Sequence, residues 1–274
     1  MAIEPKDDIV DTLVEYFSMT AMICSASELR KLYYRAKNIP KSKTKAILKE
    51  SSSGLVLDGL LLAEGGRADL IKAFRGAFPL LVKIPFDSDD AAKELNAFEV
   101  LGDYNPDEVS IIGPVRKVTL TRESRDEIEF ALEMPLLTCS LSLVPRPISD
   151  EVLEEVARAL LAALEFVHSK GIVHGDVKIS NILIQKGKFY LADFGSSVKI
   201  GEPLTSTTIS SLPDTIAEDA LIASEGLDWF QGAVVLAQLK DYMSADVRTN
   251  ANFLYNVFPS HVDGTAVRFI LSKL

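Results

Sequence analysis

IVHGDVKISNILIQKGKFYLADFG, residues 172–195, contains short apolar runs that alternate with isolated polar residues. The pattern predicts a short strand, a polar loop, a second strand, a turn and a third strand. Asp176, Lys178, Asn181 and Asp193 stand among residues that are otherwise typical of a buried core. We therefore expect buried flanks to hold these four polar side chains in fixed positions.

Two carboxylates, one amide and one ammonium group in fixed positions suit the transfer of a phosphoryl group. That reaction needs a carboxylate near the attacking hydroxyl, a second carboxylate and an amide on Mg²⁺, and a positive charge on the moving phosphate. The stretch supplies each of these groups. The remainder of the chain is expected to serve as the scaffold of such a site.

Composition limits the class of protein. The chain has 274 residues, of which 47% are hydrophobic, so it is long and apolar enough for two lobes with their own cores. Its net charge of −10 disfavours nonspecific binding to nucleic acid or to an anionic membrane. Cys24 and Cys139 have no neighbouring His or Cys at metal-ligand spacing, which favours a reducing compartment. With no signal peptide and no apolar run of about 20 residues, the chain is expected in the cytoplasm or the nucleus.

Residues 1–50 are expected to form a helical leader and linker. Helical periodicity over about 7–21 and 27–37 is followed by the Ser- and Lys-rich stretch 41–54, which predicts a linker. Basic residues predominate between Glu28 and Glu50, which leaves open a docking patch for an acidic partner or a solvated helix face. The apolar stripe of the leader needs a partner surface, in this chain or in a second copy.

Residues 51–134 show short apolar runs separated by turn residues, and residues 135–274 are expected to be mainly helical. Five antiparallel strands are expected, at 55–64, 69–74, 78–84, 110–120 and 127–134, with one helix between the third and the fourth. Asp87 or Ser88 is its expected cap. In the second half, Ser149 and Asp150 begin a core helix that finishes at Gly171.

Lys83 lies inside an apolar strand, where burial of its charge costs free energy unless an anion is near. Glu94, on the expected helix, is the partner that we predict. Glu99, further along the same helix, is the alternative.

His174-Gly175-Asp176-Val177-Lys178-Ile179-Ser180-Asn181 resembles the catalytic loop of the eukaryotic-type protein kinase family, and Asp193-Phe194-Gly195 resembles its metal-binding turn. The similarity covers roughly residues 55–274. It implies an α+β, two-lobe protein-kinase-like fold with an N-lobe at 51–134 and a C-lobe at 135–274. It also implies that Asp176 accepts the substrate proton, that Lys178 neutralises the moving phosphate, and that Asn181 and Asp193 hold Mg²⁺.

The same resemblance assigns the nucleotide site. Lys83 and Glu94 would form the ion pair that anchors the nucleotide phosphates, and the backbone of Glu133 and Met134 would pair with the adenine edge. Gly65 and Gly66 would lie in the loop that covers the phosphates. That loop, AEGGRA at 63–68, keeps only Gly65 in register with the three glycines of the family.

Further departures concern control. Gly175 stands where the family often has an arginine that pairs with a phosphorylated activation segment, so control by such a phosphate is disfavoured. The Ser/Thr cluster at 205–211 is therefore expected to be a flexible loop. Asp228 matches the aspartate that ties down the catalytic loop, or it is a helix cap. The chain ends at VRFILSKL, which resembles the penultimate helix, so the C-lobe is either trimmed or naturally minimal.

The resemblance implies a protein serine/threonine kinase that uses ATP and Mg²⁺ to phosphorylate a protein substrate, with Lys178 favouring serine or threonine over tyrosine. A pseudokinase that acts as a binding or scaffold module is the alternative, because the glycine loop is degenerate. A small-molecule phosphotransferase of the aminoglycoside or choline kinase type is a second alternative, because His174-Gly175-Asp176 followed by Asn181 resembles those enzymes as well.

Overall fold

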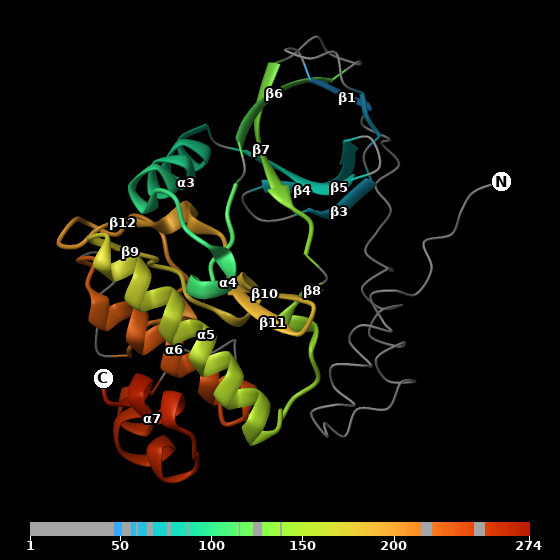
Figure 1. Ribbon diagram of the computed structural model, residues 1–274. Coiled ribbons are helices and arrows are strands. Elements are labelled where there is room, and N and C mark those ends of the chain that lie inside the picture. The colour runs from blue at the N-terminus through green and yellow to red at the C-terminus, as the bar shows by residue number, and fades with distance from the viewer. Residues whose placement is uncertain are drawn as a thin grey trace.

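The computed structural model describes residues 47–50, 56–58, 60–64, 68–75, 78–86, 88–114, 116–122, 128–137, 139–214, 221–243 and 250–274. The two helices expected within 1–50 lie outside these residues, and so do Gly65 and Gly66. The described part of the chain forms a β-rich small lobe above a helical large lobe (Figure 1).

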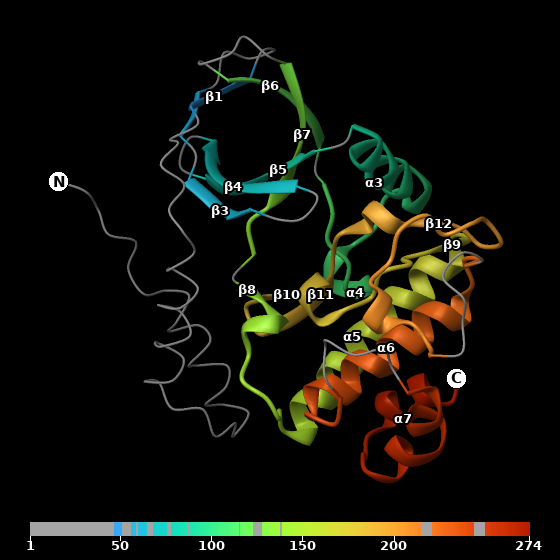
Figure 2. The same cartoon turned by 180° about the vertical axis from the view of Figure 1, so that it is seen from behind.

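The small lobe is built on one antiparallel sheet in the order β2-β1-β6-β7-β5-β4-β3. The two outer strands, β2 and β3, follow one another in the chain, so the sheet curls until its ends approach each other (Figure 2). Its strands are β1 (Ile47–Glu50), β2 (Val56–Asp58), β3 (Leu60–Glu64), β4 (Ala68–Arg75), β5 (Phe78–Pro85), β6 (Arg116–Arg122) and β7 (Ile128–Pro135).

The prediction of five strands is corrected to seven in the described residues, by two changes at the start of the lobe. The strand expected at 55–64 is divided into β2 and β3, and β1 occupies part of the expected linker. Strand β1 pairs with β6 on one side and β2 on the other, so backbone groups that would otherwise face water are satisfied by neighbours. A run of four residues carries too little alternation to be recognised from sequence.

The helix of the small lobe is α3 (Ser88–Leu101), in agreement with the expected bounds. Ala91, Glu94, Ala97 and Leu101 are buried on one face, which corrects the face expected from the apolar pattern, Ala92, Leu95, Phe98 and Leu101. Gly102 follows with φ 67°, a conformation that glycine adopts at low cost and that ends the helix. A short helix, α4 (Pro106–Val109), leads back towards the sheet.

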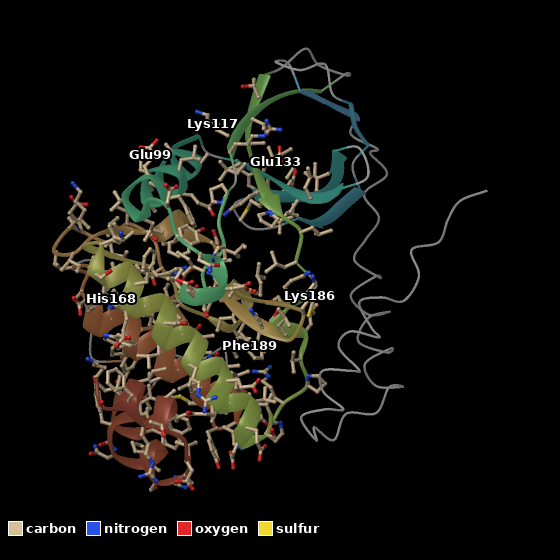
Figure 3. The ribbon with its side chains drawn as sticks, viewed as in Figure 1. Glu99, Lys117, Glu133, His168, Lys186 and Phe189 are labelled. Atoms are coloured by element: carbon tan, nitrogen blue, oxygen red, sulfur yellow. The ribbon has the colours of Figure 1, made fainter. Side chains whose placement is uncertain are left out.

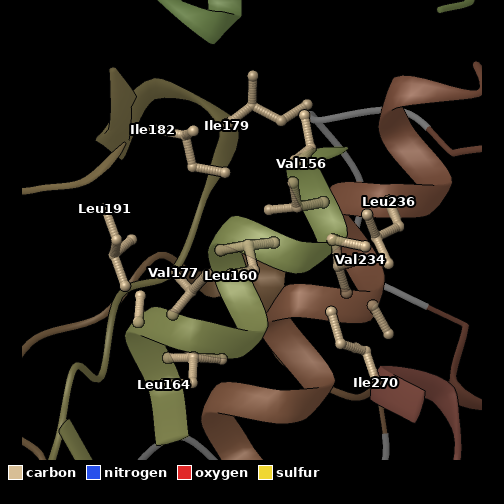
Figure 4. Close-up of a cluster of buried hydrophobic side chains, with 14 of the residues drawn as sticks. Val156, Leu160, Leu164, Val177, Ile179, Ile182, Leu191, Val234, Leu236 and Ile270 are labelled. Atoms are coloured by element: carbon tan, nitrogen blue, oxygen red, sulfur yellow. The ribbon is translucent and has the colours of Figure 1, made fainter. Parts of the chain in front are cut away.

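The large lobe is organised around α5 (Asp150–Ser169) and α6 (Glu225–Leu239), which lie side by side (Figure 1). Apolar side chains of α5 pack against α6, α7 and the strands of the lobe (Figure 4). The oxygen of Ser149 accepts a hydrogen bond from the Val152 N–H, as expected of an N-cap. The remaining elements are β8 (Cys139–Ser140), β9 (Ile172–Val173), β10 (Ile182–Gln185), β11 (Lys188–Leu191), β12 (Val198–Lys199) and α7 (Thr265–Leu271).

Residues 172–195 form the predicted series of strands. Strand β9 precedes the polar loop, and β10 and β11 form a hairpin in which Ile182 is opposite Leu191. Both of these residues belong to the core of the lobe, beside Val177 and Leu160 (Figure 4). No helix among the described residues is both long and apolar enough to cross a membrane.

Candidate active site

The carboxylate of Asp228 holds the polar loop, residues 174–181, in place. Asp228 lies in the first turn of α6, and it is fully buried. Its carboxylate accepts hydrogen bonds from the backbone N–H of His174 and of Gly175, each at 2.8 Å, and contacts Nε2 of His168 at the same distance. Ser224, not Asp228, caps the helix. Of the two interpretations of Asp228, the structure supports the one in which it ties down the loop.

Asp176, which is buried, and the half-buried Lys178 contact each other within this loop. The Lys178 ammonium donates to Oδ2 of Asp176 at 2.7 Å, and the Asn181 side-chain amide donates to the backbone oxygen of Asp176 at 2.9 Å. Thr208, from the later Ser/Thr-rich segment, joins them. Its N–H donates to Oδ1 of Asp176 at 2.8 Å, and its hydroxyl accepts from Lys178 at 3.0 Å. The segment expected to be a flexible loop is therefore hydrogen-bonded to the site at Thr208, a contact that the sequence pattern does not predict.

Asp193 and Lys83 join the two lobes. Asp193 has φ 67°, an uncommon conformation for a residue with a side chain, and such residues cluster at functional sites. The Lys83 ammonium lies 2.5 Å from Oδ1 of Asp193 and 2.7 Å from Oε2 of Glu94. Glu94 is buried, whereas Glu99 is exposed on α3 (Figure 3). Lys83 thus contacts the partner that the sequence predicts and not the alternative.

Burial and charge act in opposite directions on these three groups. Burial lowers the pKa of Lys83, but the carboxylates of Glu94 and Asp193 outweigh burial and raise that pKa above its ordinary value. Burial raises the pKa of Glu94, and the nearby Lys83 reduces this shift without cancelling it. For Asp193, burial again favours the neutral form, yet the charge of Lys83 prevails and lowers its pKa. The ammonium is thus held in its charged form.

A series of edge-to-face aromatic contacts connects α3 to the polar loop. The ring of Phe98 lies edge-on to that of Phe194 with centroids 4.9 Å apart, and Phe194 lies edge-on to His174 at 4.7 Å. Nδ1 of His174 accepts from the Asp176 N–H, so Nε2 carries the proton and donates to the Ala192 carbonyl. Since Phe98 is one helical turn from Glu94, these aromatic contacts link the position of Glu94 to that of Asp193.

The β3–β4 hairpin of the small lobe is held by backbone pairing. Strands β3 and β4 pair with a register shift between Leu61 and Ala63, and Glu64 is opposite Asp69 at the last pair before the turn. Ala68 is buried, although the family pattern favours glycine at this position. Because Gly65 and Gly66 lie outside the described residues, their assignment to the phosphates stays a prediction.

Glu133 and Met134 lie within β7 and not beyond it. Glu133 is opposite Val82 on β5 and Arg116 on β6, so its backbone belongs to the interior of the sheet (Figure 3). Its side chain forms an ion pair with Arg116 at 2.9 Å. Met134 is opposite Leu81 on β5, and β7 continues to Pro135, which is opposite Leu80. The pairing of the Glu133 and Met134 backbone with an adenine edge stays a prediction.

Comparison with known proteins finds similarity to protein kinases. Residues 116–246 match the family model described as protein kinase domain. Solved kinase domains share the fold over nearly the whole chain. The matched residues include part of the small lobe, the polar loop, Asp193 and Asp228.

Curated kinases match this domain over short stretches. Mitogen-activated protein kinase kinase kinase ANP1 of Arabidopsis thaliana is 40% identical over 70 residues, which are 25% of this chain and 10% of that protein. A protein of Caenorhabditis elegans described as cAMP-dependent protein kinase, catalytic subunit-like, is 30% identical over 98 residues, which are 34% of this chain and 24% of that protein. The chain thus spans a tenth to a quarter of the length of these relatives.

Two solved kinase domains share the fold of this chain. The ROP18 kinase domain in complex with AMP-PNP and sucrose has a TM-score of 0.61 at 17% identity, covering 99% of this chain and 89% of that chain. The kinase domain of a rhoptry antigen specific to Toxoplasma gondii has a TM-score of 0.62 at 12% identity, with coverages of 98% and 90%. At such identities, the likeness concerns the fold alone.

Asn181 and Asp193 offer oxygen atoms of the kind that Mg²⁺ accepts. Asn181 uses its N–H₂ group on the backbone of Asp176, which leaves the amide oxygen for another ligand. Asp193 follows Ala192, whose N–H donates to the Asn181 carbonyl at 2.9 Å, so the two candidate ligands come from adjoining segments. Carboxylate and amide oxygens are ligands that Mg²⁺ accepts, and it commonly takes the remainder from phosphates and water.

Proposed function

We propose that this chain is a protein serine/threonine kinase, which transfers the γ-phosphoryl group of ATP to a protein hydroxyl with the help of Mg²⁺. One observation carries the proposal above the others. Lys83 from the small lobe contacts Asp193 from the large lobe, and the same ammonium is held by Glu94. An assembled pair of this kind places a positive charge beside the metal-binding carboxylate, as phosphoryl transfer requires.

In the proposed mechanism, Asp176 orients the attacking hydroxyl and accepts its proton. Its carboxylate is already directed by Lys178 and by the Thr208 N–H. Lys178 is then close enough to neutralise charge on the transferred group. Asn181 and Asp193 would hold Mg²⁺, which supplies charge neutralisation on the nucleotide phosphates when bound.

The nucleotide would lie between β3–β4 and the polar loop. Lys83 would bind its phosphates, and the turn containing Gly65 and Gly66 would cover them. The adenine edge would pair with backbone groups from Met134 onwards, because Glu133 is flanked by strands on both sides. The ROP18 kinase domain was solved with AMP-PNP, an ATP analogue, and this supports nucleotide binding by the shared fold.

The direct test is transfer of label from γ-labelled ATP to the protein itself and to a generic protein substrate such as casein, in the presence of Mg²⁺. Asp176→Asn keeps the size of the side chain but removes the carboxylate, so we expect transfer to fall by about a hundredfold or more. Acid hydrolysis should release phosphoserine or phosphothreonine. If the original protein and Asp176→Asn label both substrates equally poorly, the proposal fails.

The pseudokinase is the second candidate, and the hairpin is the observation that favours it. Ala63 and the buried Ala68 stand where close approach to phosphates favours glycine, and the acids Glu64 and Asp69 are opposite each other at the end of the hairpin. If the chain is a pseudokinase, Asp176→Asn keeps the fold and the unfolding temperature of the original protein. Phosphoryl transfer is then undetectable with either protein.

The leader adds a proposal about partners. Residues 1–50 would mediate self-association or dock a partner through their expected apolar and basic faces. The solution mass measured with and without these residues tests self-association, and we expect the shortened chain to show the lower degree of assembly. An equal degree of assembly for both chains removes the idea.

A further inference from the structure

Gly175, the residue before Asp176, has no room for a side chain. Its φ is 77°, and a Cβ atom placed there would lie 2.6 Å from Cδ1 of Leu204 and 2.9 Å from the carbonyl oxygen of Ser196. A charged side chain at this position is therefore sterically excluded. The segment that follows Gly195 must be held against the loop in another way.

Gln231, on α6, reaches the loop from the core. Its side chain is fully buried, and all of its described hydrogen bonds go to the loop or to the segment beyond it. Oε1 accepts from the Val177 N–H at 2.8 Å, and the N–H₂ group donates to the Gly175 carbonyl at 3.3 Å and to the Thr207 hydroxyl at 3.0 Å. A buried amide with both its oxygen and its nitrogen engaged is a specific connection, because an unpaired amide would be costly to bury.

Thr207 connects Gln231 to Asp176 through the neighbouring residue Thr208. Thr207 is followed directly by Thr208, whose N–H donates to Oδ1 of Asp176 and whose hydroxyl accepts from Lys178. Gln231 thus holds the loop on one side of Asp176 and the segment on the other. Thr208 donates one hydrogen bond to Asp176 and accepts another from Lys178. Together these bonds fix the carboxylate of Asp176 relative to Lys178.

We propose that Gln231 is a positioning residue that latches the segment around Thr207 onto the polar loop, so that the segment is ordered without a phosphate group. The inference rests on the proposed kinase function for its effect on turnover, but the latch itself is a property of the fold. An amide suits this task because it offers a donor and an acceptor and carries no charge that would respond to phosphorylation.

Thr207→Val breaks the latch with the least disturbance. It removes the hydroxyl but keeps the branched shape of the side chain, and it leaves the bonds from Gln231 to Val177 and Gly175 in place. Gln231→Leu is a less suitable variant because it would leave those two backbone groups unpaired in the core, which can prevent folding. Thr207→Ser retains the hydroxyl, and Thr205→Val changes an exposed threonine of the same segment. These two variants are the controls.

Amide hydrogen exchange of residues 204–211, followed by mass spectrometry, tests the latch directly. We expect Thr207→Val to accelerate exchange in this segment by about fivefold to tenfold, the effect of one lost hydrogen bond, with exchange in α5 unchanged. Thr207→Ser and Thr205→Val should keep the original protection, and phosphatase treatment should not reduce it. Exchange within twofold of the original in Thr207→Val, equal acceleration in Thr205→Val, or loss of protection after phosphatase treatment would each overturn the proposal.

Kinetics separate this proposal from the proposed function. If the protein transfers phosphate, Thr207→Val should lower kcat by about fivefold to tenfold while the KM for Mg²⁺-ATP stays within twofold, because Asp176 loses orientation while the nucleotide contacts remain. A changed KM with unchanged kcat contradicts a positioning role. If the original protein shows no transfer at all, the kinase function fails, and the exchange experiment still decides whether the latch exists.

Discussion

The large-lobe side of the site, residues 174–181, is fixed by side chains from α6, whereas the small-lobe side, β3 to β5, is fixed by its backbone ladder and by the ion pairs of Lys83. The two sides therefore have different sensitivities. The polar loop has no regular ladder of its own and depends on buried polar partners, each of which is costly to lose. The hairpin depends on backbone pairing that most side-chain substitutions leave intact.

The largest expected effect comes from Asp228. Asp228→Ala leaves the N–H groups of His174 and Gly175 without their acceptor inside the core. We expect the free energy of unfolding to fall by about 3–5 kcal/mol. Ala68→Gly on the hairpin should cost about 0.5–1 kcal/mol. Urea denaturation of both variants measures the contrast, and equal losses would refute the difference between the two sides.

A smaller effect is expected where α3 meets the segment between α4 and β6. A Cβ atom at Gly113 would lie 1.8 Å from Cζ of Phe98, so Gly113→Ala forces this ring to move away from Phe194. Overpacking of this kind costs about 1–3 kcal/mol. Adding Phe98→Leu to Gly113→Ala should recover part of the lost unfolding free energy. A double-mutant cycle measured by urea denaturation tests this. Additive losses would mean that the two residues do not compete for space.

Lys83 provides a test that depends on pH. Lys83→Met leaves Glu94 and Asp193 without their cation, and we expect a loss of about 1–3 kcal/mol at pH 7. Because Lys83 lowers the pKa of Asp193, its stabilising effect is complete above the ordinary carboxyl pKa and is lost as the pH falls through the lowered value. Protonation of Glu94 acts in the same direction, since its pKa is already raised by burial. The difference in unfolding free energy between the two proteins should thus shrink as the pH falls from 7 to well below the ordinary carboxyl pKa, and a constant difference would contradict the assigned contacts.

The sequence predicts most of what local patterns can encode. Helix α5 follows from its apolar stripe and its Ser149 cap, and the contact between Lys83 and Glu94 follows from the need of a buried ammonium for an anion. Thr208 and Gln231 could not be found in this way. Their hydrogen bonds join segments 30 and 54 residues apart, and a buried glutamine leaves no periodic signal. The sheet position of Glu133 depends on strand register, which its own sequence does not determine.

Thermal unfolding with increasing concentrations of Mg²⁺-ATP measures whether the small-lobe side holds the nucleotide over the preformed loop. A ligand that binds only the folded state stabilises it by about 2.7 kcal/mol at a hundred times its Kd. We predict that the unfolding temperature of the original protein rises with Mg²⁺-ATP concentration and that of Lys83→Met rises much less. An unchanged unfolding temperature of the original protein at millimolar Mg²⁺-ATP would contradict the account.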